Sequence, residues 1–173
     1  MDAENRRVRI KNALQSSRMP ISASRLAGEL GVSRQIIVGD VALLRAAGTE
    51  IIATPRGYTL PAGSAAQGKT FRIACRHRSE QMKEELFTII DYGCQVLDVI
   101  VEHPIYGELT GSLHLASRFD AEEFLRRCRS ESAAPLSLLT EGIHLHTILC
   151  PDEDAFRRVT DALREKGILL PGE

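Results

Sequence analysis

The sequence predicts an α+β protein: an N-terminal winged helix-turn-helix followed by a second α+β domain with a mainly antiparallel sheet. Apolar residues recur at helical spacing through residues 6–47, and two short strand patterns follow at residues 50–60. Beyond a stretch of small residues, strand and helix patterns alternate. We therefore expect domains at residues 1–61 and 70–173, joined by a linker at residues 62–69.

The N-terminal domain, residues 1–61, is expected to contain three helices and a two-stranded wing. Gly31 can end the second helix, and Ser33 can cap the third across a tight turn. A cluster of Thr, Pro, Arg and Gly separates the two wing strands. The expected helices span residues 6–14, 24–30 and 34–47, and the expected strands span residues 50–53 and 57–60.

The third helix is expected to bury Ile37, Val41 and Leu44, which leaves its opposite side to enter the major groove of DNA. Basic residues of the first helix would contact phosphates or the minor groove. A three-helix unit that mediates only protein contacts is the alternative. The candidate DNA-contacting residues are Arg34, Gln35, Val38, Arg45 and, at the wing tip, Arg56.

The distribution of charge agrees with an N-terminal domain that binds DNA. Residues 1–61 carry nine Lys/Arg against five Asp/Glu, whereas residues 62–173 carry 13 against 18. A net charge of +4 favours phosphate contacts, although many domains with this charge bind no nucleic acid.

The cysteines and the apolar runs indicate the compartment. The four cysteines include no C-x-x-C pair, there is no secretory signal, and the longest apolar runs fall far below the roughly 20 residues that cross a bilayer. We expect reduced thiols, a cytoplasmic location and no membrane partner.

The C-terminal part predicts the element order βαββαβα, with helices on one face of the sheet. Ser79 is expected to cap the first of its helices, and glycines end the first and last. The expected strands span residues 70–76, 96–101, 108–115 and 143–150, and the expected helices span residues 80–92, 120–129 and 152–166.

His144 and His146 are the most informative pair of residues in the chain. On a strand they share one face, roughly 7 Å apart, so both imidazoles can converge on one metal ion. His77, at a strand end, and Glu85 could complete the set. Glu85 lies on the helix stripe that faces the sheet, whereas Glu84 is expected to face solvent. A single strand histidine is more often a hydrogen-bonded packing residue.

Two runs carry a resemblance to a known family. The runs VEHPIYGE at residues 101–108 and GIHLHT at residues 142–147, with His77 and the Glu84-Glu85-Leu86 segment, resemble the 3H domain. Joined to a winged helix, they resemble bacterial niacin-responsive repressors of NAD biosynthesis and transport genes, over about residues 6–170. The resemblance implies nicotinic acid as co-repressor and a divalent metal bound by His77, Glu85, His144 and His146.

The chemistry of these side chains agrees with a metal site. Imidazole suits Zn, Ni, Cu and Fe, and we expect Ni or Zn. Three neutral imidazoles and one carboxylate leave a divalent site with a net charge near +1, which attracts an anionic ligand. Ligation by the Cys75 thiolate is an alternative, since Cys75 could share a face with His77.

His103 and Tyr106 are expected near the ligand pocket, either beside the metal ligands or in contact with the co-repressor. The alternative is a turn that Pro104 and Gly107 shape and over which Tyr106 packs. Gly39 departs from the longer polar residue that such repressors tend to carry in the recognition helix, and it should cost roughly 1 kcal/mol of helix stability relative to Ala.

Three other interpretations of the function compete with a sensor of a co-repressor. The metal itself could be the signal, the site could activate water as a metalloenzyme, or the chain could be a ligand-binding module without DNA affinity. Against catalysis, Glu85 would be consumed as a ligand and no H-E-x-x-H motif supplies a general base. Because symmetric operators match symmetric dimers, we expect a homodimer on double-stranded operator DNA.

Overall fold

The computed structural model describes residues 2–61, 68–130 and 134–172. The chain forms two compact units, Met1–Ala65 and Ala66–Glu173. Most of the predicted linker, residues 62–67, lies outside the described residues. Its last residue, Lys69, already begins the first strand of the C-terminal unit.

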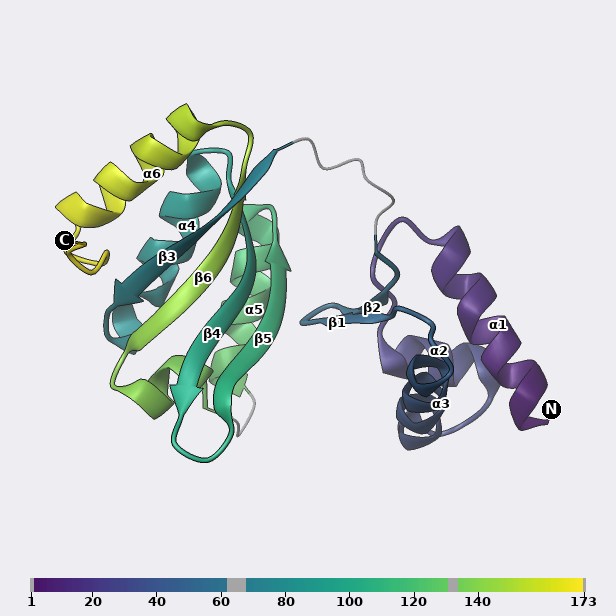
Figure 1. Ribbon diagram of the computed structural model, residues 1–173. Coiled ribbons are helices and arrows are strands. Elements are labelled where there is room, and N and C mark those ends of the chain that lie inside the picture. The colour runs from purple at the N-terminus through teal and green to yellow at the C-terminus, as the bar shows by residue number, and fades with distance from the viewer. Residues whose placement is uncertain (1, 62–67, 131–133, 173) are drawn as a thin grey trace. The chain divides into compact units, whose positions relative to one another are not determined.

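The N-terminal unit contains the predicted helix-turn-helix and wing (Figure 1). The side chain of Ser22 accepts a hydrogen bond from the Arg25 amide, and Ser33 caps the next helix in the same way through Ile36. Gly31 ends the second helix with a φ of 67°, a conformation that favours glycine. The elements are α1 (Ala3–Ser16), α2 (Ala23–Leu30), α3 (Arg34–Ala46), β1 (Ile52–Thr54) and β2 (Gly57–Thr59).

The wing is joined to the helical part through its second strand. Tyr58 exchanges two backbone hydrogen bonds of 2.8 Å with Ile21, just before α2. A Cβ atom at Gly57 would lie 2.4 Å from the Ile21 backbone, so only glycine permits this approach. Ile37 and Val41 of α3 are buried in the core, as predicted, whereas Leu44 is only partly buried.

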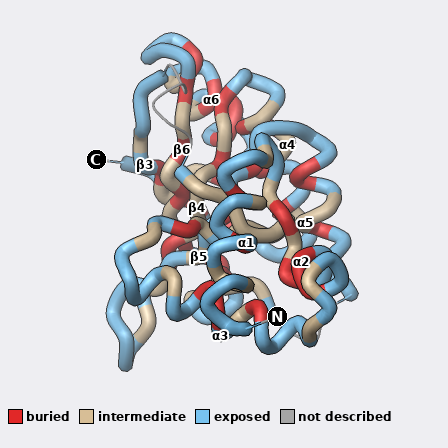
Figure 2. The backbone as a smooth tube through the Cα atoms, turned by 90° about the vertical axis from the view of Figure 1, so that its right-hand side faces the viewer, coloured by how far each residue is buried: buried red, intermediate tan, exposed pale blue. Residues whose placement is uncertain are grey.

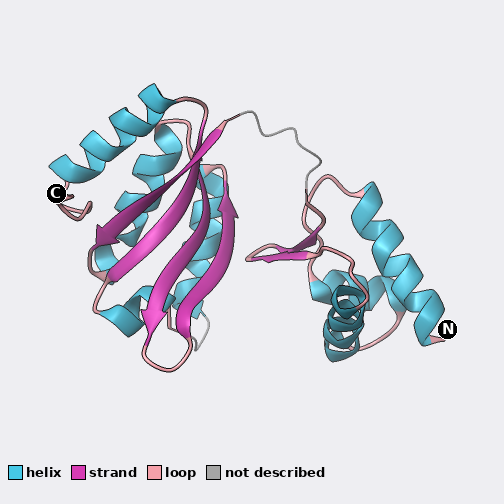
Figure 3. Ribbon diagram, in the orientation of Figure 1, coloured by secondary structure: helices cyan, strands magenta, loops and turns pink. Residues whose placement is uncertain are grey.

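The C-terminal unit has the predicted order of strands and long helices and a four-stranded antiparallel sheet (Figure 3). The order across the sheet is β3-β6-β4-β5, so the strand with the His-x-His pair is central. The elements are β3 (Lys69–Arg76), α4 (Met82–Asp91), β4 (Gln95–His103), β5 (Gly107–Leu115), α5 (Arg118–Ser130), β6 (Ile143–Cys150) and α6 (Glu153–Glu165).

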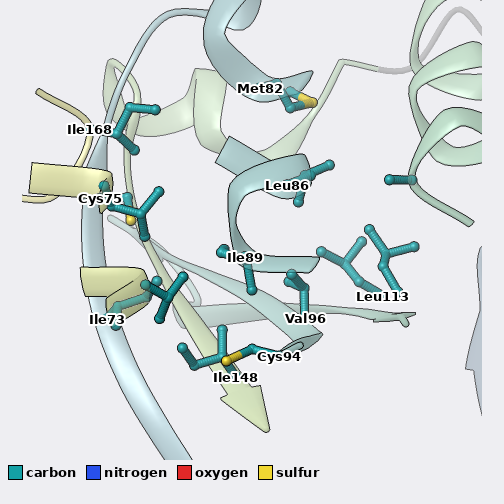
Figure 4. Packing of buried hydrophobic residues seen from close by; sticks show 14 of the residues in the cluster. Ile73, Cys75, Met82, Leu86, Ile89, Cys94, Val96, Leu113, Ile148 and Ile168 are labelled. Atoms are coloured by element: carbon teal, nitrogen blue, oxygen red, sulfur yellow. The ribbon is translucent and has the colours of Figure 1, made fainter. Parts of the chain in front are cut away.

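The three helices of this unit cover one face of the sheet (Figure 1). Burial alternates along β6, where His144, His146, Ile148 and Cys150 are buried and the residues between them are not. Buried stretches also recur along the helices in Figure 2. The histidines therefore share the helix-covered face with the apolar core, part of which Figure 4 shows.

Three features differ from the sequence-based expectations. Ser79 lies in a short 3-10 helix, η1 (Ser79–Gln81), and caps neither η1 nor α4 with its side chain. A second 3-10 helix, η2 (Leu136–Thr140), precedes β6. The backbone of residues 168–170 bonds to β3 at Ala74 and Arg76, which covers part of that edge of the sheet.

Candidate functional site

The structure brings His77, Glu85, His144 and His146 together on the helix-covered face of the sheet. The two β6 histidines point to this face because they are two residues apart on a strand. His77 follows β3, whose register pairs Arg76 with Ile143. Glu85 lies in the first turn of α4, on the same buried stripe as Met82 and Ile89, so that it faces the sheet.

Glu85 lies at the centre of this histidine-glutamate cluster. Its Oε2 atom is 2.6 Å from His77 Nε2 and 3.3 Å from His146 Nε2, and its Oε1 atom is 3.0 Å from His144 Nε2. The exposed fractions of the four residues are only 8%, 1%, 3% and 3% in chain order. As predicted, Glu85 is buried, whereas Glu84 is exposed and pairs with Lys166 at 2.9 Å.

The three imidazoles are held in one orientation by backbone carbonyls. The Nδ1 atoms of His77, His144 and His146 lie 2.8, 2.9 and 2.6 Å from the carbonyl oxygens of Arg78, Gly142 and Asp98, respectively. Because a carbonyl can only accept, each Nδ1 donates the hydrogen bond. In a neutral imidazole the lone pair is then on Nε2, which is the atom that faces Glu85.

Charge interactions in the cluster oppose the effect of burial. Burial disfavours the charged form of Glu85, but the histidines outweigh it and hold the pKa of Glu85 well below its usual value of 4.5. Burial likewise disfavours charge on His77 and His146, but Glu85 outweighs it and raises the pKa of both above 6.5. Without metal, the cluster thus favours the protonated forms of His77 and His146 beside the Glu85 carboxylate.

This arrangement can bind a cation. Three Nε2 atoms and two carboxylate oxygens are all acceptors unless protons occupy the nitrogens, so the cluster requires a positive charge between them. His146 Nε2 is buried and lacks a hydrogen-bond partner among the described residues. Divalent transition metals use donor sets of this kind. Here the set is three imidazoles, each with its Nδ1 atom bonded to a backbone carbonyl, and one carboxylate.

Sequence reasoning missed two residues that orient the histidines. Gly142 has a φ of 88°, and a Cβ atom there would lie 2.2 Å from the His77 carbonyl oxygen. The presence of a glycine directly before Ile143 and His144 could have indicated that the backbone approaches another segment closely here. Asp98 lies at an irregularity of β4, where its carbonyl reaches His146 and its carboxylate accepts a hydrogen bond from the Thr147 amide. No local pattern indicates that irregularity.

His103 and Tyr106 lie at the end of β4 and in the turn before β5. The Nδ1 atom of His103 accepts hydrogen bonds from the amides of Ile105 and Tyr106, at 3.2 and 3.4 Å. The two rings lie 5.1 Å apart, and Tyr106 is 72% exposed. These contacts agree with the alternative in which both residues shape the turn, and contact with a ligand stays a prediction.

The predicted DNA-contacting residues differ in their surroundings. Arg34 and Gln35 are exposed at the start of α3, whereas Val38 and Arg56 are partly buried. Arg45 bonds through Nε to the Ile51 carbonyl at 2.9 Å, and its guanidinium lies 5.7 Å from the centre of the Tyr58 ring. Arg45 thus also attaches α3 to the wing.

Two basic residues of α1 interact with a buried carboxylate of α3. Asp40 is only 4% exposed, and its oxygens lie 2.5 Å from Arg6 Nε and 3.6 Å from Arg7 Nη1. The expectation that the first-helix basic residues contact DNA is therefore weakened for these two arginines. The sequence contained no local signal for this pair, because 34 residues separate Arg6 from Asp40.

Comparisons with known proteins agree with the two-part organisation. Residues 6–59 match the model of an HTH domain, and residues 70–172 match that of the 3H domain. Within the described residues, no helix is long and apolar enough to span a membrane.

Two curated relatives resemble almost the whole chain. The probable transcription repressor NiaR of Thermotoga maritima is 42% identical over 161 residues, which cover 93% of this chain and 91% of the relative. The transcription repressor NadR of Bacillus subtilis is 42% identical over 168 residues, which cover 96% and 93%. The chain therefore belongs to the 3H-domain family, and in this chain the HTH domain precedes the 3H domain.

Proposed function

We propose that this chain is a DNA-binding transcription repressor that holds a divalent transition metal in its 3H domain and senses nicotinic acid as co-repressor. The HTH match and the names of the two relatives support the repressor function. Both relatives are named as repressors, which argues against an enzyme. In this proposal Arg34, Gln35 and Val38 of α3 contact the operator, together with Arg45 and Arg56.

One observation carries the metal part of the proposal: three imidazoles donate through Nδ1 to backbone carbonyls and direct Nε2 at one buried carboxylate. This is how proteins orient histidines as metal ligands. His77, Glu85, His144 and His146 would hold the ion, and imidazole ligands favour Ni or Zn over Mg or Ca.

Nicotinic acid fits such a centre by charge. A divalent ion with three neutral imidazoles and one carboxylate has a net charge near +1. When bound, the ion would supply a positive centre that attracts the carboxylate of nicotinic acid. A homodimer belongs to the proposal as well, because two recognition helices are needed to read a symmetric operator.

A second candidate function is favoured by burial. The side chains of the histidine-glutamate cluster are at most 3% exposed, and all four proposed ligands come from one chain. A small ion enters such a site more easily than an organic acid does. In this alternative the Ni or Zn ion is itself the signal, and DNA affinity follows metal occupancy without any organic ligand.

The test is the affinity of the full chain for DNA upstream of niacin-transport or NAD-salvage genes, measured by fluorescence anisotropy. Metal-free protein, metal-loaded protein and metal-loaded protein with nicotinic acid are compared. The proposal predicts that nicotinic acid tightens binding only in the metal-loaded protein, and that His144→Ala or a chelator removes the effect. Nicotinamide, which lacks the carboxylate, is the matched control ligand.

The two candidates give different results in this assay. A response to metal that nicotinic acid does not change would support the ion as the signal. DNA affinity that neither metal nor nicotinic acid changes would contradict both candidates and leave a repressor with another control.

A further inference from the structure

Cys75 lies beside the histidine-glutamate cluster. It is completely buried on β3, and the strand register places it directly opposite His144. Its Sγ atom, a carboxylate oxygen of Glu85 and a ring nitrogen of His144 all lie within 4.8 Å of one another. Ligands of one zinc ion lie roughly 3.5 Å apart, given metal–ligand bonds of 2.0–2.3 Å, and Glu85 Oε1 is already 3.0 Å from His144 Nε2. The sulfur would therefore have to approach these atoms by at most roughly 1.3 Å.

Cys75 lies where the apolar core meets the histidine-glutamate cluster. Figure 4 shows its side chain among the core residues, near Ile168, and the backbone of Cys75 pairs with Leu169. A protonated thiol packs there as a small apolar side chain. Toward Glu85 and His144, however, it presents a sulfur atom to a group of metal-binding atoms.

A second observation at the same cluster concerns His146. His146 Nε2 is buried within the cluster without a hydrogen-bond partner among the described residues, and it lies 3.3 Å from Glu85 Oε2. Glu85 forms ion pairs with the three imidazoles of the cluster. A metal ion would satisfy these nitrogens, and the sulfur would be within reach of the same ion.

We propose that Cys75 is a fifth, sulfur donor of the metal site and that it makes the site select soft transition metals over hard ions such as Mn²⁺. This inference rests on the proposed metal function of the cluster. Because a bound thiolate brings the net charge of the centre from near +1 to near zero, it favours the candidate function in which the ion itself is the signal. When the S–metal bond forms, the S–H bond breaks and the proton passes to solvent, so no oxidant or reductant is required. Thiolate favours Zn, whereas Mn and Mg prefer oxygen ligands.

The other cysteines provide internal controls. Cys94 and Cys150 are buried with their Sγ atoms 2.6 Å apart, and Cys150 lies four residues beyond His146 on β6. At about 3.4 Å per residue, Cys150 is roughly 14 Å along the strand from that histidine. Cys128 lies on α5, which contributes no residue to the cluster.

The experiment is the absorption spectrum of the cobalt(II)-loaded full chain. Thiolate bound to Co²⁺ gives a strong near-ultraviolet charge-transfer band, and bound Co²⁺ itself gives weaker visible bands. We expect both in the natural protein. Cys75→Ser should abolish the charge-transfer band and retain the visible bands, while the variant Cys94→Ala/Cys128→Ala/Cys150→Ala, in which Cys75 is the only thiol, should retain both.

The outcomes separate this inference from the proposed function. Visible bands without a charge-transfer band in the natural protein would overturn the role of Cys75 and leave the metal site intact. Failure to bind Co²⁺, Ni²⁺ or Zn²⁺ would overturn the metal site itself. If Cys75→Ser does not fold, the variant with Cys75 as its only thiol still decides the question, because loss of its charge-transfer band would contradict the inference.

Metal selectivity gives a second measurement. Loss of a partner that merely orients a ligand costs roughly 10–100-fold in metal affinity, so loss of a direct donor should weaken Zn²⁺ binding by at least about tenfold. Cys75→Ser should have little effect on Mn²⁺ affinity, so that the ratio of the two affinities falls. Equal loss for both ions would show that Cys75 only packs against the site.

Discussion

Asp40 in the HTH domain and Glu85 in the 3H domain are both buried carboxylates, but their partners differ. Asp40 contacts Arg6 and Arg7, whose charges are permanent. Glu85 forms its ion pairs with the imidazoles of His77, His144 and His146, which can exchange their protons for a metal ion. The first carboxylate is neutralised within the fold, whereas the charge balance of the second depends on what is bound.

This difference separates a structural carboxylate from a candidate binding site. Burial alone does not distinguish them, since the exposed fractions are 4% and 1%. The partner chemistry does, because an arginine cannot release its proton to admit a metal ion and a histidine can.

The largest expected effect is on metal affinity. Glu85→Gln keeps the shape of the side chain but removes its charge, so we expect Zn²⁺ or Ni²⁺ affinity to fall by at least about 100-fold, because the loss of even an outer partner costs roughly 10–100-fold. Competition with a chromophoric chelator measures this affinity. Asp40→Asn, the matched change in the other domain, should leave it unchanged while lowering the melting temperature. An equal fall in both variants would contradict the distinction.

The glycines of the two domains should respond in opposite directions. Ala at position 142 requires a positive φ and meets the His77 carbonyl, so Gly142→Ala should cost roughly 2 kcal/mol or more of unfolding free energy. Gly39 lies in α3 with no atom within 4 Å of an added Cβ, so Gly39→Ala should add about 1 kcal/mol. Chemical denaturation measures both. Stabilisation by Gly142→Ala would show that its close contact with His77 is misplaced.

Arg34→Ala tests the DNA-binding domain independently of the metal. Because Arg34 is exposed at the start of α3, we expect a loss of DNA affinity of about tenfold and, if it contacts a phosphate, a salt dependence weaker by about one counterion. Anisotropy titrations at several salt concentrations measure both. Arg25→Ala on α2, whose side chain pairs with Glu29, is the control. The same loss in both variants would indicate a general charge effect rather than recognition by α3.

The pH dependence of the metal-free protein should reflect the histidine-glutamate cluster. His77 and His146 have raised pKa values in the folded protein. Their contribution to stability is therefore present below pH 6.5 and is lost as the pH rises through these raised pKa values. Glu85 has a lowered pKa, so its contribution is present above 4.5 and is lost as the pH falls through the folded value. Unfolding free energy should therefore decline from about pH 6.5 upward.

With metal bound, the free energy of unfolding should instead rise with pH, because deprotonated imidazoles bind the ion more tightly. Denaturation curves with chelator and with Zn²⁺ compare the two states, and His146→Ala should reduce the slope of the metal-free curve. A metal-free stability that does not change between neutral and alkaline pH would contradict the assigned charges.

Local periodicity predicted much of both domains. The cap at Ser33, the common face of His144 and His146, and the burial of Glu85 instead of Glu84 all follow from helix and strand geometry within a few residues.

Features that depend on distant pairing were not predictable in this way. The contact of residues 168–170 with β3, the approach of the Asp98 carbonyl to His146 and the Arg6–Asp40 pair require tertiary structure. Cys75 could be placed on the face of His77 from spacing alone, but its position opposite His144 depends on the strand register.

The most direct test of the account is the metal content of the full chain after equilibrium dialysis against Ni²⁺ or Zn²⁺, measured by mass spectrometry. We expect about one tightly held ion per chain in the natural protein and almost none in the His144→Ala/His146→Ala variant, with near-native helix and strand content in both. A natural protein that retains no more metal than this variant would contradict it.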